Sequence, residues 1–213
     1  MQSDRRDVKC GVLLITCAVA GLVVMAFHPT GHGMMDPTTA TRLRLINVAV
    51  HSLAIASAPA LFLAMLGVAR YLGRSDLTVA ALVAFGFAAV GTMGAAIASG
   101  FVAPGVMTHI VAANGSQVPG AFLVYTSLWN QGFAKVHTVA SSVGVVLWSI
   151  TILRTGLMPR PIAWYGMLMG VAIAALLLTG LLTLDVHGFG VVTAAQSLWF
   201  IAVGWALMRR DAS

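Results

Sequence analysis

Histidine is the residue type in this chain best suited to bind a metal ion or exchange a proton, and its copies are unevenly placed. Each one falls either in a loop between long apolar segments or near one end of such a segment. If these segments cross a membrane, as argued below, all the histidines lie toward the same side. The six are His28, His32, His51, His109, His137 and His187. This distribution suggests metal or haem chemistry on that side, although loop histidines are also tolerated on any water-facing surface.

The segment after the first apolar run combines several ligands for a soft metal ion. It contains two imidazoles, two thioethers and a carboxylate within nine residues, HPTGHGMMD. Thioether groups suit Cu(I), and imidazole suits copper and zinc alike. A helical zinc-ligand pair is excluded, because Pro29 and Gly31 make the segment a turn. The predicted metal site consists of His28, His32, Met34 and Asp36.

Two histidines lie inside apolar runs, at similar predicted depth. A polar group in the hydrocarbon region is costly, so it usually pairs with another group or serves a function. His51 and His137 come from different segments and could therefore hold a haem b, or copper, between two imidazoles. They could equally form hydrogen bonds across helices and hold the helices together.

Helical spacing places further polar groups beside these two histidines. Asn47 lies one turn from His51, and Asn130 lies two turns from His137. Lys135 is the only lysine outside the N-terminal tail, and it could pair with Asp185 or extend to the lipid headgroups. We therefore predict a polar cavity on the external side, formed by Asn47, His51, Asn130, Lys135, His137 and Asp185.

The segments that must position these residues are long apolar runs. Apolar residues make up 59% of the 213 residues and charged residues only 8%, against about 25% charged residues in soluble domains. A helix needs about 20 residues to cross a bilayer. Six runs meet this length, at 10–27, 45–69, 77–101, 121–153, 162–184 and 191–208. Residues 1–213 are thus predicted to form one all-α domain, a bundle of six transmembrane helices in contact with lipid.

Basic residues indicate the orientation of this bundle. Nine Lys and Arg residues flank one predicted side and three flank the other, which places both termini in the cytoplasm. The net charge of +6 is scattered in ones and twos, so nucleic-acid binding is not predicted. The longer connections, 28–44 and 102–120, and the short one at 185–190 lie outside. The tryptophans, Trp148 and Trp199 included, are predicted to line the membrane interfaces.

Signatures of common enzymes are missing from the sequence. The chain has no Glu to serve as a general base and no Gly-x-Ser-x-Gly or phosphate-binding loop. Cys10 and Cys17 are seven residues apart, too far for a disulfide within one helix. Gly166 and Gly170 form a GxxxG motif, which is typical of close helix packing.

The C-terminal part resembles a known group of proteins. Residues 153–170, LRTGLMPRPIAWYGMLMG, combine a basic Pro-Arg turn with an apolar span that opens on an aromatic residue and a glycine. Together with DVHGFG at 185–190 and the basic end of the last span, they resemble multi-pass bacterial inner-membrane proteins catalogued as a domain of unknown function. The resemblance covers roughly the last 60 residues. It implies a multi-pass protein of the bacterial inner membrane, and no activity or catalytic residue.

Three classes of function remain open from the sequence. The first is a binding, sensing or accessory protein with the histidine-bearing cavity on its external side. The second is a small transporter, or a subunit of a larger complex or homo-oligomer whose contact uses the Gly166 and Gly170 face. The third is a metal- or haem-dependent redox protein that uses His51 and His137.

Overall fold

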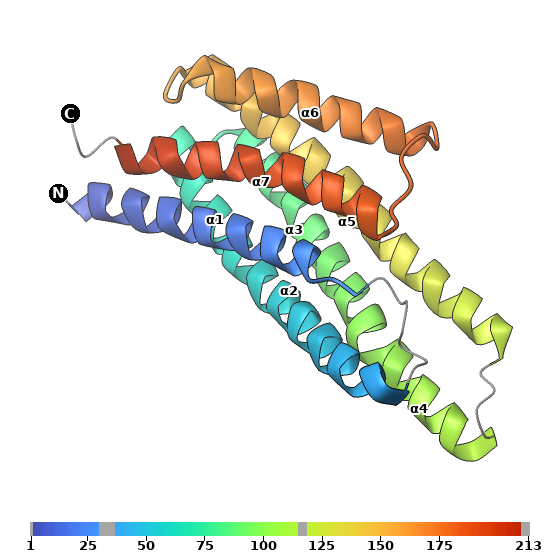
Figure 1. Ribbon diagram of the computed structural model, residues 1–213. Coiled ribbons are helices and arrows are strands. Elements are labelled where there is room, and N and C mark those ends of the chain that lie inside the picture. The colour runs from blue at the N-terminus through green and yellow to red at the C-terminus, as the bar shows by residue number, and fades with distance from the viewer. Residues whose placement is uncertain (1, 30–36, 115–118, 210–213) are drawn as a thin grey trace.

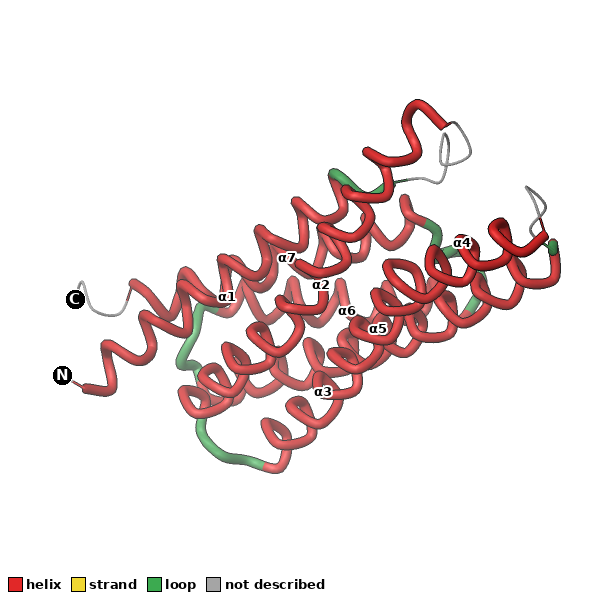
Figure 2. Tube along the Cα trace, turned by 90° about the horizontal axis from the view of Figure 1, so that it is seen from below, coloured by secondary structure: helices red, strands yellow, loops and turns green. Residues whose placement is uncertain are grey.

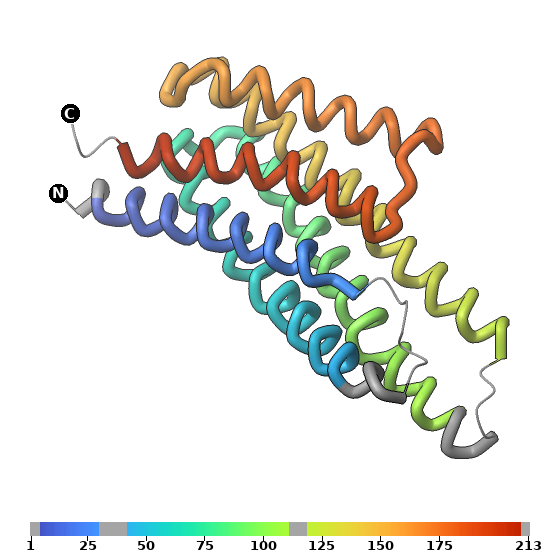
Figure 3. Tube along the Cα trace, viewed as in Figure 1, coloured from blue at the N-terminus to red at the C-terminus, as the bar shows by residue number. Residues whose placement is uncertain are grey.

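The computed structural model describes residues 2–29, 37–114 and 119–209, and every regular element in these ranges is a helix (Figure 2). Helix α3 continues through the π-helical segment η1 into α4 without a break (Figure 3). The described residues therefore form six rods, each with a part long and apolar enough to cross a membrane. The elements are α1 (Gln2–Ala26), α2 (Pro37–Leu72), α3 (Asp76–Ile97), η1 (Ala98–Val102), α4 (Ala103–Asn114), α5 (Gly120–Thr155), α6 (Arg160–Leu178) and α7 (Val186–Arg209).

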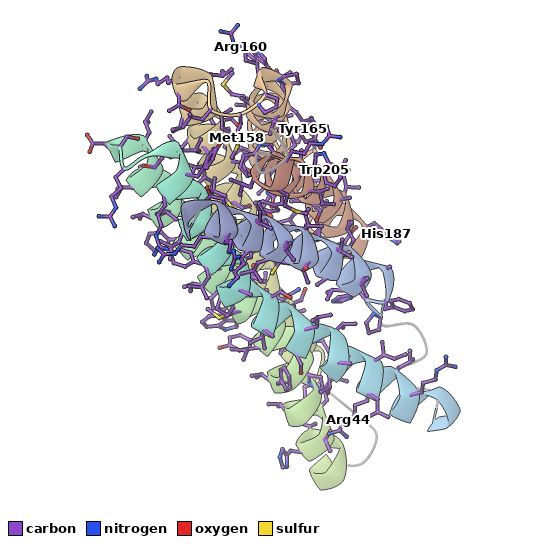
Figure 4. All side chains as sticks on the ribbon, turned by 90° about the vertical axis from the view of Figure 1, so that its left-hand side faces the viewer. Arg44, Met158, Arg160, Tyr165, His187 and Trp205 are labelled. Atoms are coloured by element: carbon purple, nitrogen blue, oxygen red, sulfur yellow. The ribbon has the colours of Figure 1, made fainter. Side chains whose placement is uncertain are left out.

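The six rods pack as a ring. Each contacts the next in the order α1, α2, α3, α5, α6 and α7, and α7 closes the ring against α1. The start of α1 and the end of α7 lie side by side at one end of the bundle, the terminal end (Figure 1). At the opposite end, the distal end, α2, α4 and α5 extend beyond α1 and α7 (Figure 1). Arg160 and Arg44 lie at the terminal and distal ends respectively (Figure 4).

Aromatic side chains fill the centre of the ring toward its terminal end. Phe85 of α3 contacts Trp148 of α5 and Phe200 of α7, with ring centres 5.6 and 5.8 Å apart. Trp148 and Trp199 stack with ring centres 6.4 Å apart, and both are fully buried. The prediction that these two tryptophans line the membrane interface is therefore wrong. A ring of six helices leaves a central space that only large side chains fill.

The GxxxG motif of α6 packs inside the chain. A Cβ atom at Gly166 would overlap Ser149 and Trp199, and one at Gly170 would lie 2.9 Å from the carbonyl oxygen of Ser142 on α5. Both glycines are buried. A homo-oligomer or a complex partner stays a prediction, but the face that was predicted for its contact is covered by α5 and α7 of the same chain.

Several helix ends differ from the predicted spans. Helix α2 begins at Pro37 rather than at 45, and the predicted external connection 102–120 is helical as far as Asn114. Helix α6 ends at Leu178 rather than at 184, because Gly180 adopts a φ of 76° that favours glycine and reverses the chain. Helix α7 begins at Val186 rather than at 191. The carboxylate of Asp185 accepts a hydrogen bond from the Gly188 N–H at 2.8 Å and so caps its first turn.

Candidate functional site

Four of the six predicted cavity residues line one hollow at the distal half of the ring. His51, Asn130, His137 and Asp185 all border a space of about 100 Å³, which we name the distal cavity. His28, just beyond the end of α1, borders it as well. The structure thus brings together residues from α1, α2 and α5 and from the start of α7. The other two predicted residues, Asn47 and Lys135, do not line it.

His51 is held in place by its own helix and by η1. Its Nδ1 donates a hydrogen bond to the carbonyl oxygen of Asn47 at 2.7 Å. Asn47 is buried, and its side-chain amide donates to the carbonyl oxygens of Ser99 and Gly100 at 3.3 and 3.4 Å. Asn47 therefore joins α2 to η1 and does not border this hollow.

The π-helical segment η1 brings the backbone of Gly100 against the His51 side chain. A Cβ atom at Gly100 would overlap the Cβ atom and the ring of His51. Single π-helical turns inside α-helices are frequent at functional sites, because they alter the direction of side chains and free carbonyl groups. The apolar pattern does not predict η1; its local signal in the sequence is a glycine beside Ser99 in an otherwise apolar run.

His28 faces His51 across the mouth of the cavity. The two ring centres are 5.0 Å apart, with the rings inclined at 66°. The Nδ1 of His28 donates to the carbonyl oxygen of Pro29 at 3.1 Å. Burial lowers the pKa of His28 below its usual value, which favours the neutral ring. Its predicted metal-site partners His32, Met34 and Asp36 lie outside the described residues.

His137 is fixed between α5 and α3. Its Nδ1 lies 2.7 Å from the hydroxyl oxygen of Thr92 and 3.1 Å from the carbonyl oxygen of Ala88. The Thr92 hydroxyl itself donates to the Ala88 carbonyl at 3.1 Å. Gly91 allows this approach, because a Cβ atom there would lie 2.7 Å from the backbone nitrogen of His137. The ring also packs on Phe189 of α7.

These hydrogen bonds assign the same tautomer to all three rings. A carbonyl oxygen can only accept, so the Nδ1 of His28, His51 and His137 carries the proton. In a neutral ring, Nε2 is then an acceptor. Among the described residues, no hydrogen bond is formed by any of these three Nε2 atoms. Three histidine rings, each with Nδ1 bonded to a backbone carbonyl, therefore border one hollow.

Of the two charged residues predicted for the cavity, Asp185 borders it and Lys135 does not. The exposed Asp185 lies at the rim, and the Gly188 N–H holds the pKa of its carboxyl below the usual value, so it is ionised at neutral pH. The Thr183 hydroxyl also donates to it, at 3.4 Å. Lys135 is exposed on the surface of α5 and does not border the hollow. Its role as a cavity residue stays a prediction that this exposed position does not support.

A second, more apolar hollow lies beside the distal cavity. This central chamber measures about 120 Å³ and ends at Phe85 and Phe200 of the aromatic cluster. Gln196, on its wall, donates to the Ser141 hydroxyl at 2.8 Å. The two hollows are neighbours, because they share the lining residues Val24, Met25, Ala54, Thr92, His137 and Phe189.

The predicted cofactors, haem b and copper, stay predictions. Within the described parts of the chain, no group of three or more His, Cys, Asp or Glu side chains is placed to hold a metal ion. Each hollow measures close to 100 Å³, which is small beside the pockets of about 300–1,000 Å³ that drug-sized ligands occupy.

Searches against protein-family models, curated proteins and solved structures find no match to the chain. Function therefore has to be inferred from the cavity itself. The resemblance of the last residues to uncharacterised membrane proteins stays a prediction.

Proposed function

We propose that this chain is a bacterial inner-membrane protein that binds a small molecule from the external side, as a receptor or sensor. The observation that carries this proposal is the set of three histidines around one hollow. Each is anchored through Nδ1, and among the described residues none has a hydrogen-bond partner for Nε2. Binding sites for small molecules combine mostly apolar walls with a few fixed polar groups, as these two hollows do.

The alternative, that the histidines only hold the helices together, explains less. Histidines that join helices use their ring nitrogens to bond across the helix interface. Here His51 bonds to its own helix and His28 to the residue next to it. Only His137 reaches another helix, and it does so with one nitrogen. The Nε2 atoms are thus left for water or a ligand.

The direction of the cavity follows from the basic residues. Arg70 and Arg74 flank the α2–α3 turn, and Arg154 and Arg160 flank the α5–α6 turn, all at the terminal end with both termini. Cytoplasmic loops are enriched in Lys and Arg. We infer that the terminal end is cytoplasmic and that the distal cavity opens to the external side.

A transporter is the second candidate, and one observation favours it. Within the described residues, five buried polar atoms lack a hydrogen-bond partner: the hydroxyls of Thr138, Ser142 and Ser149 on α5, and the Nε1 atoms of Trp148 and Trp199. None of these five residues lines the chamber; Ser142, Ser149 and Trp199 pack against the glycines of α6. A buried polar group without a partner costs about 1–3 kcal/mol, and water or a passing solute would satisfy these atoms.

Cysteine labelling of intact cells tests the proposal. In a Cys10→Ser, Cys17→Ser background, Ala54→Cys introduces a thiol where the distal cavity meets the central chamber. A membrane-impermeant methanethiosulfonate reagent added outside is expected to modify it. Val83→Cys is the control, because Val83 is exposed on the outer surface of α3, where lipid would cover it. Labelling of Ala54→Cys only after the cells are opened, or at the same slow rate as Val83→Cys, contradicts the proposal.

Reconstituted vesicles separate the receptor from the transporter. Stopped-flow light scattering would follow entry of glycerol, urea and n-butylammonium into proteoliposomes. A receptor leaves all three rates equal to those of empty liposomes. A transporter accelerates at least one, and Ser149→Val slows that rate while Ala54→Cys labelling stays unchanged.

A further inference from the structure

We propose that the ligand is a short organic ammonium ion, with its head group in the distal cavity and its apolar tail in the central chamber. This assignment rests on the proposed binding function and specifies the chemical class of its ligand. It follows from the hydrogen-bonding character, the charge and the size of the two hollows, each taken in turn.

The hydrogen-bonding character of the cavity selects a donor. The Nε2 atoms of His28, His51 and His137 are acceptors in the tautomer that their Nδ1 contacts require. Thr92, on the same wall, already donates its hydroxyl proton to Ala88. A primary ammonium head has three N–H donors. A carboxylate or phosphate head has only acceptors and would face lone pairs on every side.

The charge of the lining selects a cation. Asp185 is the only ionised group among the described residues that border either hollow, and its lowered pKa keeps it negative at neutral pH. No Lys or Arg borders them in the described part of the chain. The aromatic ring of Phe189, which also borders both hollows, can contact a cation favourably.

The size of the central chamber limits the tail. A dry cavity of about 150 Å³ lined by aliphatic and aromatic side chains accommodates benzene. At about 120 Å³, the chamber therefore has room for roughly four or five carbon atoms by that comparison. Small residues, Gly21, Ala54 and Ala58, leave this room open, and Phe85 and Phe200 close its inner end.

Binding of a matched series of probes to the purified protein tests the assignment. Isothermal titration calorimetry in mild detergent would compare ethyl-, n-butyl- and n-heptylammonium chloride with n-butanol and sodium butanoate. Affinity is expected to rise roughly fourfold per methylene from ethyl to butyl, and heptylammonium is expected to fall below that trend. Butanol should bind at least tenfold more weakly than butylammonium, and butanoate should not bind. Equal binding of butanoate, or an affinity independent of tail length, would overturn the assignment.

Three variants connect the affinities to the named residues. Asp185→Asn keeps a helix-capping side chain and is expected to weaken butylammonium severalfold without changing butanol. Ala58→Leu should move the preferred tail from butyl to ethyl by filling the chamber. His51→Phe should weaken every ammonium probe about tenfold, whereas His109→Phe, exposed on α4, should leave all affinities unchanged. If Asp185→Asn affects butylammonium and butanol equally, the ammonium assignment is wrong.

The two proposals can fail separately. External labelling of Ala54→Cys together with no preference for ammonium would leave the binding function standing and overturn the ligand class. An Ala54→Cys that is not reached from outside would contradict the binding function, and the ligand class would fail with it.

Discussion

The rings of His28 and His51 meet edge to face with their centres 5.0 Å apart. One lies just beyond the end of α1 and the other lies inside α2. This contact joins the first helix to the second at the mouth of the distal cavity. It also places two imidazoles so close that a positive charge on both would be unfavourable.

Acidification should therefore destabilise the protein. Burial lowers the folded-state pKa of His28, so its contribution to stability is complete above the unfolded pKa of about 6.5 and is lost as the pH falls through the folded value. Thermal unfolding in detergent should show a lower midpoint at pH 5 than at pH 8. His28→Phe should reduce this difference, and His109→Phe should not. The Asp185 carboxyl, on the same cavity, stays ionised over this range because its pKa is lowered.

A methyl group at Gly100 should disturb the cavity from the side of η1. In Gly100→Ala the new Cβ atom would overlap His51, so either the ring or η1 has to move. Overpacking of this kind costs about 1–3 kcal/mol. Gly105→Ala is the matched control, because a Cβ atom there meets nothing within 4 Å. The thermal midpoint of Gly100→Ala should fall while that of Gly105→Ala stays equal or rises; equal midpoints would mean that η1 is loosely packed.

A second pair of Gly→Ala variants tests whether the GxxxG motif of α6 packs helices within one chain or joins two chains. Gly166→Ala would place a Cβ atom on Ser149 and Trp199 and should destabilise the protein by about 1–3 kcal/mol. Gly132→Ala, open on α5, should have little effect. Size-exclusion chromatography with light scattering would report the oligomeric state. If Gly166→Ala instead changed only that state and left the unfolding midpoint intact, the motif would serve an interface between chains.

The number of long helices could be predicted from the sequence, but several of their ends could not. Apolar run length indicated six segments, and the structure has six helices long and apolar enough to cross a membrane. The start of α7 was placed five residues late, because Asp185 and Gly188 were interpreted as a loop when they form a helix cap. The end of α6 was placed late because apolar residues continue beyond Gly180, where the backbone reverses.

The contacts within the candidate site could likewise be predicted only in part. Spacing along one helix correctly paired Asn47 with His51 on one face, but it could not show that Asn47 turns to η1. The π-helical segment changes which residues face inward, and a periodicity of 3.6 residues does not predict it. Contacts between helices, such as His28 with His51 or His137 with Thr92, depend on the order of helices in the ring, which hydropathy does not contain.

The cap of α7 offers a further test. Asp185→Ala removes the acceptor for the Gly188 N–H and should lower the thermal midpoint at pH 7, whereas Asp185→Ser, which can still accept that bond, should retain most of it. The carboxyl pKa is lowered in the fold. The stabilisation is thus present above the unfolded value of about 3.8 and is lost as the pH falls through the folded value. At pH 3 the difference between wild type and Asp185→Ala should shrink; a constant difference would mean that the charge is not involved.

The aromatic cluster predicts unequal roles for two tryptophans of the same helix. Trp199 is fully buried against Trp148 and Phe200, whereas Trp205 is about half exposed on the outside of α7 (Figure 4). Trp199→Ala should lower the free energy of unfolding by about 3–5 kcal/mol, and Trp205→Ala by less than about 1 kcal/mol. Trp199→Phe should be milder than Trp199→Ala, because it fills most of the space and removes an Nε1–H that has no partner among the described residues. Unfolding followed by tryptophan fluorescence would measure all three. Similar costs for Trp199→Ala and Trp205→Ala would mean that the aromatic cluster is not packed as described.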